Sequence, residues 1–349
     1  MTFHPRACDP AGGRVAKIGA TGGYPLRTEA TPGTTLLAAF TPLHLLTFAP
    51  RMKHLDPREL SIPELHSYLV GAIGPRPVAF ASTIDGDGRP NLSPFSFFNV
   101  FGANPPLLIF SPARRGRDNT TKHSYHNVKA VPEVVINVVT YAMVQQTSLA
   151  STEYPEGVNE FVKAGFTPIP SDVVRPFRVK ESPVQFECRV QRVIETGTGG
   201  GAGNLVLCEV VRIHVDEAVL DERGRIDQRR IDLVGRMGGH YYCRAHGDAL
   251  FELAQPTTNL GAGVDALPSH ARLSTILTGN ELGQLGALEH VPDETRVNEY
   301  KLTELSELFI AHQDRPKELM ESLHRRAQEL LREKRVEEAW LTLLTFNDR

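Results

Sequence analysis

The segment from Gly74 to Ser111 constrains the fold more than any other part of the chain. Residues 77–84 alternate in the manner of a half-buried strand, and Asp-Gly-Asp-Gly at 85–88 then predicts a tight turn. A second extended run, 91–99, follows at once and mixes hydroxyl groups, an amide and three phenylalanines. A sheet surface of this composition can hold a flat aromatic ligand with a few fixed polar groups. The segment therefore predicts a β-hairpin whose second strand has unusual chemistry.

Both sides of this second strand are chemically mixed. Pro94 has no backbone N–H, so we expect ladder pairing to be interrupted at this residue. A broken strand exposes backbone N–H and C=O groups that a heterocycle could use. The residues alone leave two interpretations open, a ligand surface or a core strand with a bulge. Under strict alternation one side carries Ser93, Phe95, Phe97 and Asn99, and the other carries Leu92, Pro94, Ser96 and Phe98.

The hydrophobic pattern of the following residues predicts several antiparallel strands with helices between them. The glycine-rich stretch 196–203 matches the letters of a dinucleotide-binding motif, but a strand follows it and that motif needs a helix. It is therefore expected to be a hairpin loop. Long hairpins with short helices favour a mainly β protein, a closed or partly open β-barrel rather than a doubly wound sheet. The expected strands are 107–111, 134–139, 183–195 and 205–215, and the expected helices are 63–70, 120–130, 142–150 and 158–164.

The two ends of the chain have a different character. Residues 1–51 hold only two acidic residues and no persistent periodicity, so we expect disorder, and we advance the hypothesis that translation begins at Met52. Residues 261–286 are loop-like, and two helices are expected at 302–312 and 317–344. The second of these is amphipathic and is expected to pack on the barrel or on a partner subunit. The expected division is 1–51, 52–255 and 256–349.

Charge and cysteine usage exclude some classes of protein. The chain has 38 Lys and Arg against 41 Asp and Glu, a formal net charge of −3, which argues against a general nucleic-acid binder. No apolar run approaches the roughly 18 residues of a membrane span. The four cysteines are far apart with no Cys-x-x-Cys, which predicts buried, reduced thiols in a cytoplasmic protein and no metal site.

Three further segments carry candidate binding residues. Ser82 and Thr83 end a strand, where hydroxyl groups satisfy backbone groups or contact a ligand. Residues 114–122 place basic side chains and hydroxyl groups just before a helix, which suits a phosphate but also an ordinary N-cap and a solvated loop. Residues 235–242 combine glycines, Arg236 and two tyrosines, as in a pocket wall or a terminal loop.

Taken together, these segments resemble the flavin reductase-like family with the FMN-binding split-barrel fold, the group that includes flavoredoxin. The resemblance covers roughly residues 52–255, and several short motifs occur in order with sensible spacing. The matching pieces are Pro75–Thr83, Asn91–Asn99, Gly116–Asp118 with Thr120 and Asn127, Glu181–Cys188, and Gly235–Gly239 with Tyr241.

The resemblance implies a homodimer with FMN near the subunit interface. It places Ser82 and Thr83 at the phosphate or the ribityl chain, and Arg117, Asp118 and Thr120 near the phosphate. Lysine is usual in the family where this chain has Arg117, and arginine is also a good phosphate partner. Asn91, Leu92, Ser93, Pro94, Phe95 and Ser96 would run along the isoalloxazine edge, Phe97, Phe98 and Asn99 would shape the ring pocket, and Arg236, Gly238 and Tyr241 would complete the site.

The function implied is an NAD(P)H-dependent, FMN-binding flavin reductase-like oxidoreductase. The cofactor would carry the chemistry, so no catalytic side chain is assigned. Reduced FMN would pass electrons to an acceptor or to a partner monooxygenase. The alternative is a non-enzymatic FMN-binding electron carrier or flavin store. This alternative would be favoured if Trp340 and the C-terminal helix folded over the flavin ring, because nicotinamide could not then reach it.

Overall fold

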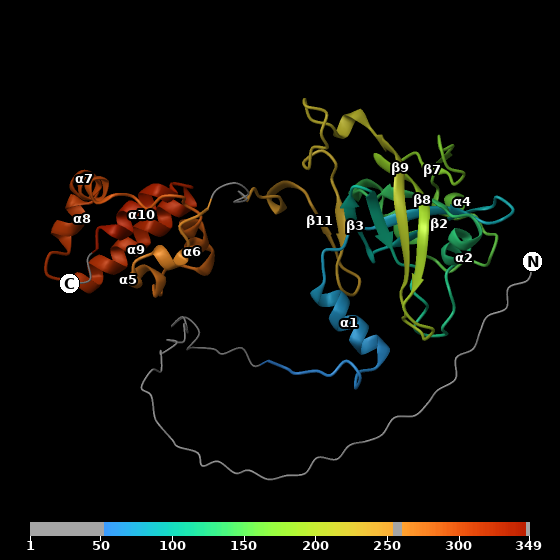
Figure 1. The fold of residues 1–349 in the computed structure, drawn as a ribbon, viewed down its shortest axis with the longest axis horizontal. Helices are drawn as coiled ribbons and strands as arrows, with labels where there is room; N and C mark the ends of the chain where they lie inside the picture. Colours follow the sequence, from blue (N-terminus) through green and yellow to red (C-terminus); the bar gives the residue numbers. More distant parts are fainter. Residues whose placement is uncertain (1–51, 254–259, 347–349) are drawn as a thin grey trace, which may run out of the picture. The chain divides into compact units, whose positions relative to one another are not determined.

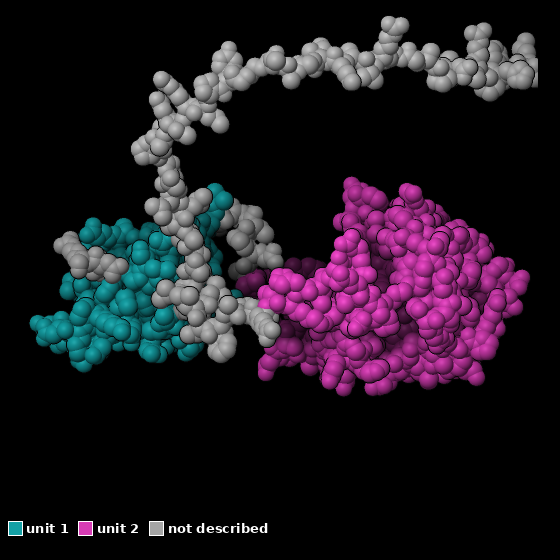
Figure 2. Space-filling view, turned by 90° about the horizontal axis from the view of Figure 1, so that it is seen from below, with its two compact units in different colours: residues 1–50, 259–349 teal, residues 51–258 magenta. Residues whose placement is uncertain are grey.

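The computed structural model describes residues 52–253 and 260–346, which fall into two compact units on either side of Thr258 and Asn259 (Figures 1 and 2). The expectations for residues 1–51 lie outside the described residues. Among the described residues, no helix is both long enough and apolar enough to cross a membrane. The first unit along the described chain, labelled unit 2 in Figure 2, holds a seven-stranded sheet with short helices, and the second, labelled unit 1 in Figure 2, is helical.

The sheet of the first unit is antiparallel throughout. Its strands lie in the order β2-β1-β5-β8-β9-β4-β3. The strands are β1 (Ala79–Ile84), β2 (Pro90–Phe95), β3 (Phe98–Ala103), β4 (Pro106–Phe110), β5 (Glu133–Val138), β8 (Val184–Glu195) and β9 (Asn204–Val215). The short strands β6 (Pro168–Ile169) and β7 (Arg178–Val179) form one small ribbon, and β10 (Val234–Arg236) and β11 (Tyr242–Arg244) form another.

The sheet curls on itself into a partly closed barrel. Phe95 of β2 lies against Phe110 of β4, with ring centroids 5.4 Å apart, although four strands separate β2 from β4 in the sheet. The apolar interior also includes Ala79, Ala81 and Ile136. The predicted β-barrel with inserted helices is thus confirmed. The loop at 196–203 joins β8 to β9 as a hairpin, as predicted.

The expectation that the first strand is half-buried was wrong. All six residues of β1 are buried, because the strand is covered on both sides. Ala79 and Ala81 face the barrel interior, whereas Phe80 packs edge-to-face on Phe166 at 5.1 Å in a second apolar cluster. Helix α4 (Glu160–Ala164) contributes Phe161 to that cluster, which the local alternation could not indicate.

The expected interruption at Pro94 was also misplaced. Pro94 stays in the β2 ladder opposite Phe80, and the strand ends only at Phe95. Proline is tolerated there because β2 is an edge strand and the missing N–H costs no second pairing. The extended strand is interrupted at Ser96 and Phe97, between β2 and β3, so the strict alternation expected for residues 91–99 does not persist.

The remaining helices of the first unit are close to their expected positions. Helix α1 (Ile62–Ala72) begins with a capping box between Ser61 and Glu64. Helix α2 spans His123–Ala130 and starts later than predicted, because Asn119 adopts φ 57° in a turn. The predicted helix at 142–150 is a 3₁₀ turn, η2 (Tyr141–Met143), followed by α3 (Val144–Leu149).

The second unit contains more helices than expected. The loop expected at 261–286 contains α5 (Ser269–Arg272) and α6 (Gly279–Gly286). Two helices, α7 (Glu294–Glu304) and α8 (Ser306–Ala311), occupy the next segment. The last predicted helix is two helices, α9 (Pro316–Arg332) and α10 (Val336–Leu344), which separate where Lys334 adopts φ 61°.

These helices bury their apolar faces on one another. Trp340 is fully buried among Leu285, Leu330 and other residues of the unit, and its Nε1 donates a hydrogen bond to the Leu285 carbonyl oxygen at 2.8 Å. The apolar face of α9 is therefore satisfied within the helical unit rather than being left for the barrel. Because the Trp340 ring is enclosed in this core, it cannot stack on a ligand.

Candidate functional site

A pocket of about 550 Å³ lies where β2 ends, and we call it the Ser93–Phe97 pocket. It is built from segments far apart in the chain: α1, the approach to β1, the end of β2, the residues before α2, and the β10–β11 ribbon. Its wall is formed by His66, Ser67, Val70, Arg76, Val78, Ser93, Pro94, Phe95, Ser96, Phe97, Ser111, Ala113, Lys122, Ser148, Ser151, Arg236, Met237, Gly239 and Tyr242.

The charge of this pocket is positive. Arg76, Lys122 and Arg236 line it, and no carboxylate is among its lining residues in the part of the chain that the structure describes. Burial lowers the pKa of Arg76, and the nearby charge of Arg236 adds to the effect. Cations that line a pocket together, with no carboxylate in its wall, favour an anionic ligand.

Arg76 also holds the pocket walls together. Its Nη1 donates to the carbonyl oxygens of Val70, at 2.8 Å, and Ile73 at the end of α1, and its Nη2 donates to that of Met237 at 3.0 Å. The backbones of Arg76 and Arg236 exchange hydrogen bonds of 2.9 and 2.8 Å. One buried guanidinium thus ties the end of α1 to the β10–β11 ribbon.

The ribbon presents Arg236 beside an aromatic ring. The Arg236 guanidinium lies 4.7 Å from the centre of the Tyr242 ring, and its Nη2 donates to the Gly239 carbonyl oxygen at 2.6 Å. Gly238 serves the packing, since a Cβ there would lie 2.9 Å from the Gly71 Cα. Tyr241 is 75% exposed and is not among the lining residues.

Lys122 is a pocket residue that the sequence reasoning passed over. It lies at the N-cap position of α2, and its Nζ is 3.8 Å from Glu153 Oε1. Burial lowers the pKa of its ammonium group, and the charge of Arg115 lowers it further. The available signal was its place in the basic run 114–122, directly before the helix.

The structure brings part of the predicted set to this pocket. Ser93, Pro94, Phe95, Ser96, Phe97 and Arg236 line it. The other predicted residues of the second run are outside it. Leu92 is fully buried, Asn91 lines a neighbouring cavity, and Phe98 and Asn99 belong to β3.

Ser82 and Thr83 are both completely buried and are not among the lining residues of this pocket. Thr83 Oγ1 accepts hydrogen bonds from Nδ2 of Asn127, at 3.1 Å, and of Asn91, at 3.4 Å. Asn91 Nδ2 also donates to Ser124 Oγ at 2.9 Å. These bonds connect β1, β2 and α2, so Thr83 has a structural role here.

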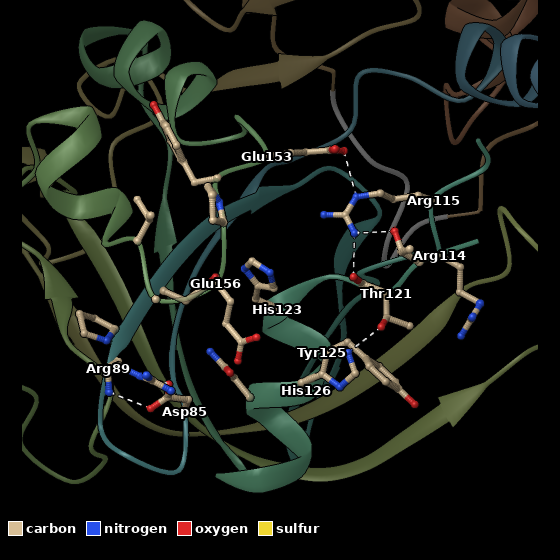
Figure 3. Close-up of a pocket in the computed structure, with 18 of the residues that line it drawn as sticks. Asp85, Arg89, Arg114, Arg115, Thr121, His123, Tyr125, His126, Glu153 and Glu156 are labelled. Carbon is tan, nitrogen blue, oxygen red and sulfur yellow. Dashed lines mark hydrogen bonds and ion pairs between the residues drawn. The ribbon is translucent and has the colours of Figure 1, made fainter. Parts of the chain in front are cut away.

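Arg117, Asp118 and Thr120 also lie elsewhere. Arg117 and Thr120 line a second cavity, of about 1100 Å³ (Figure 3). The Arg117 guanidinium pairs with Glu153 and, at 3.1 Å, with Asp118. The hydroxyl and backbone N–H of Thr120 donate to Asp118 and, with Arg117, hold the pKa of its carboxyl group well below the usual range. The three residues expected near the phosphate thus lie outside the Ser93–Phe97 pocket.

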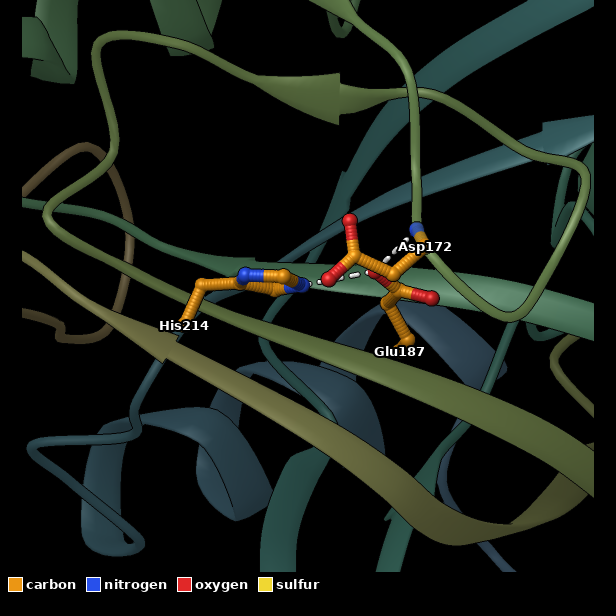
Figure 4. A group of neighbouring side chains, drawn as sticks. All are labelled: Asp172, Glu187 and His214. Carbon is orange, nitrogen blue, oxygen red and sulfur yellow. Dashed lines mark hydrogen bonds and ion pairs between the residues drawn. The ribbon is translucent and has the colours of Figure 1, made fainter.

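A third cluster, Asp172, Glu187 and His214, has the residue types of a metal site (Figure 4). Its centre, Glu187, is completely buried and already accepts four hydrogen bonds. The donors are the backbone N–H groups of Asp172 (2.8 Å), Val173 (2.7 Å) and Val174 (3.2 Å), and Nε2 of His214 (2.6 Å). The cluster is therefore an anchor for the loop after β6.

Comparisons with known proteins agree with this architecture. Residues 72–232 match the model of the flavin reductase like domain. An uncharacterized protein of Aquifex aeolicus is 36% identical over 184 residues, 53% of this chain and 91% of its own. Nitrilotriacetate monooxygenase component B from Bacillus cereus is 31% identical, with a TM-score of 0.55 over 59% of this chain and 100% of its own. A protein with a split barrel domain from Shewanella frigidimarina is 25% identical, with a TM-score of 0.50 over 58% of this chain and 100% of its own.

Proposed function

The chain belongs to the flavin reductase-like family, and from this premise we propose that it is a flavoprotein oxidoreductase that holds FMN in the Ser93–Phe97 pocket. The observation that carries the proposal is the charge of that pocket, which has three cationic side chains and no carboxylate among its described lining residues. A flavin mononucleotide needs an anion site next to a flat, partly apolar surface. The pocket supplies both within about 550 Å³.

The residues present fit this cofactor. Lys122 is the cation proposed for the phosphate, because it stands at the start of α2. Phe97, which is 42% exposed, offers apolar surface to a ring, and the hydroxyl groups of Ser93 and Ser96 can bond to its polar edge. The backbone of Ser96 lies between β2 and β3, outside both strands, and its polar groups can do the same.

Bound FMN would supply hydride and electron transfer. The chain's residues would bind the ring, orient it and exclude water from its buried face, so no acidic or basic side chain is assigned to catalysis. We propose NAD(P)H as the electron donor. Trp340 is enclosed in the helical core, so that side chain does not cover the ring, and the reduction assay below separates the reductase from the electron-carrier alternative.

A homodimer is proposed on the exposed edge of the sheet. Strand β3 is an edge strand, and its Val100 and Phe101 are each 62% exposed, next to Phe97 at 42%. Exposed apolar residues on an unpaired strand edge are a typical pairing surface. A second copy on this edge would lie next to the pocket, because Phe97 lines the pocket and directly precedes β3.

For the electron acceptor we propose a separate protein, such as a monooxygenase component. The similarity to a protein named as component B of a monooxygenase supports this. The two buried, free thiols, Cys188 and Cys208, support a reducing compartment, and we propose the cytoplasm.

The test is the absorbance spectrum of the purified chain with FMN under anaerobic conditions. Addition of NADPH or NADH is expected to bleach the flavin. A chain that binds FMN but is bleached by neither donor would support the electron-carrier alternative, and one that binds no FMN would refute the proposal.

The binding residues can be tested separately. Lys122→Met is expected to weaken FMN binding by about 10-fold to 100-fold, the value of a charged hydrogen bond of about 1.5–3 kcal/mol. Arg117→Met is the matched control, because Arg117 is outside the pocket and is already paired with Glu153 and Asp118. Equal effects of the two variants would contradict the assignment of Lys122.

A further inference from the structure

The second cavity shares a wall with the Ser93–Phe97 pocket, and we call it the arginine cavity. Along β2, Ser93 lines the pocket and Asn91 lines the cavity. Directly before α2, Lys122 lines the pocket and Thr121 lines the cavity. The 3.8 Å contact between Lys122 and Glu153, which lines the cavity, joins the two. The remaining lining residues are Asp85, Arg89, Pro90, Arg114, Arg115, Arg117, Thr120, His123, Tyr125, His126, Asn127, Tyr154, Pro155, Glu156, Gly157 and Val158.

Positive charge is in excess on the side of this cavity nearest the pocket. Glu153 pairs with three cations at once: Arg115 at 2.9 Å, Lys122 at 3.8 Å, and Arg117. Asp118 is the second carboxylate of the group, and Arg114 adds a cation whose hydrogen bonds go to Asn119. The group therefore has two more positive than negative charges, or one more when Lys122 is engaged by the phosphate of FMN. The lowered pKa of Lys122, caused first by burial and then by Arg115, is in keeping with this excess.

Arg115 is held in place for binding. Its Nε donates to Glu153, and its Nη1 donates to Thr120 Oγ1 at 2.9 Å and to the Thr121 carbonyl oxygen at 2.7 Å. Its Nη2 has no partner among the residues that the structure describes. In Figure 3 the guanidinium of Arg115 points into the cavity between Glu153 and Thr121. A rigid arginine fork with a free donor suits a phosphate group.

The opposite side of the cavity is closer to neutral. Arg89 Nε is 2.6 Å from Asp85 Oδ2. The negative charge of Glu156 also contributes to raising the pKa of Arg89, after the larger effect of Asp85. Figure 3 shows Arg89 and Asp85 across the cavity from Arg115. The cavity thus has one strongly cationic wall and one wall of mixed charge, and its lining also includes Tyr154 and Asn91. This combination suits a nucleoside that has its phosphate at one end.

We propose that the arginine cavity binds the adenosine 2′-phosphate end of NADPH, so that the protein prefers NADPH to NADH. This inference rests on the proposed function, which requires a pyridine nucleotide beside the flavin. The volume of about 1100 Å³ is ample for an adenosine bisphosphate. The missing dinucleotide-binding motif agrees with recognition by arginine side chains instead of a glycine-rich turn. Without nucleotide, Glu153 pairs with Arg115 and Arg117, and the phosphate of a bound nucleotide would compete with Glu153 for them.

The test is calorimetric titration of the FMN-loaded full chain with 2′,5′-ADP, with 5′-AMP as the comparison. The 2′-phosphate is expected to tighten binding at least 10-fold. Arg115→Ala is expected to remove this difference, and Glu153→Gln to enlarge it several-fold, because it removes the competing carboxylate. Arg192→Ala, an exposed arginine on β8 outside the cavity, is the matched control and should change nothing.

Three results would overturn the proposal. One is no binding of 2′,5′-ADP, or binding no tighter than that of 5′-AMP. Another is an unchanged dissociation constant in Arg115→Ala. The third is that the flavin-free chain binds FAD more tightly than FMN and that Arg115→Ala abolishes this difference. The cavity would then hold the adenylate of the flavin itself.

Because titration with a fragment involves no electron transfer, its outcome is independent of the reduction assay. A chain that binds 2′,5′-ADP but is not reduced by NADPH would refute the proposed reductase and retain the site. In a reducing chain, Arg115→Ala is expected to lower the NADPH-to-NADH ratio of kcat/KM at least 10-fold through KM.

Discussion

Replacing the buried carboxylate of Glu187 by an amide should destabilise the sheet unit strongly. Glu187→Gln keeps the shape of the side chain, but an amide has one accepting oxygen where the carboxylate has two. The carboxylate now accepts four hydrogen bonds, from the backbone N–H groups of Asp172, Val173 and Val174 and from His214. At least one backbone N–H would face the amide NH₂ group, and the charge that strengthens the other bonds would be lost.

The magnitude follows from these contacts. A hydrogen bond to a charged group contributes about 1.5–3 kcal/mol, and the loss of two such bonds gives an expected destabilisation of about 3–6 kcal/mol. Glu195→Gln, on the same strand, is the matched control. Its side chain is 49% exposed, pairs with Lys129 at 3.0 Å and accepts a hydrogen bond from Tyr125, and its replacement should lower the urea midpoint far less than Glu187→Gln does.

The assay is urea unfolding followed by two probes. Trp340 is the only tryptophan of the chain and is buried in the helical unit, so its fluorescence reports on that unit. Far-UV circular dichroism reports on the sheet as well. Glu187→Gln should move the sheet transition to lower urea and leave the Trp340 transition in place. A free energy of unfolding of the sheet within about 1 kcal/mol of wild type would refute the reasoning.

The pH dependence provides a second check. Burial alone would raise the pKa of Glu187, but the N–H groups of Asp172 and Val173 and the bond from His214 outweigh it, and the pKa lies below the usual value. The carboxylate therefore contributes stability above its unfolded pKa, about 4.3, and this is lost as pH falls through the folded value. The difference between wild type and Glu187→Gln should shrink below about pH 4.3.

Three further outcomes are expected. Burial, aided by the nearby His270, lowers the pKa of His324 to about 4, so the helical unit should lose stability as pH falls from about 6.5 to 4, by roughly 3 kcal/mol. Urea titrations followed by Trp340 fluorescence at both pH values measure this loss, and an equal midpoint at both would contradict it. Lys334→Gly should stabilise the same unit by about 1 kcal/mol, because Lys334 is exposed at φ 61° between α9 and α10, and an unchanged midpoint would count against backbone strain there. Gly165→Ala should destabilise the sheet unit by about 1 kcal/mol, because Gly165 adopts φ 72° and an alanine is strained there. A Cβ would have room, since its nearest atom, Gln146 Nε2, would be 3.5 Å away. A cost well above about 2 kcal/mol in circular dichroism melts would show that space is limiting instead.

Local sequence determined the elements of the sheet unit well. The turn at 85–88 joins β1 to β2, and the glycine-rich stretch 196–203 joins β8 to β9. Both follow from residues a few positions apart, because turn chemistry and strand periodicity are short-range properties. The composition of residues 93–97 likewise identified one wall of the pocket before the fold was known.

Only the tertiary structure decided which polar residues face that pocket. Thr83 and Lys122 both have plausible chemistry for a phosphate, yet Thr83 is buried in a network with Asn91 and Asn127 whereas Lys122 lines the pocket. Arg117 lies five positions before Lys122 in the chain and lines another cavity. The direction of a side chain in a loop depends on contacts with distant segments, here with Glu153, and no local pattern encodes those contacts. For the same reason, the sequence indicated a binding surface, and the packing of α1, β2 and the ribbon gave that surface its shape and charge.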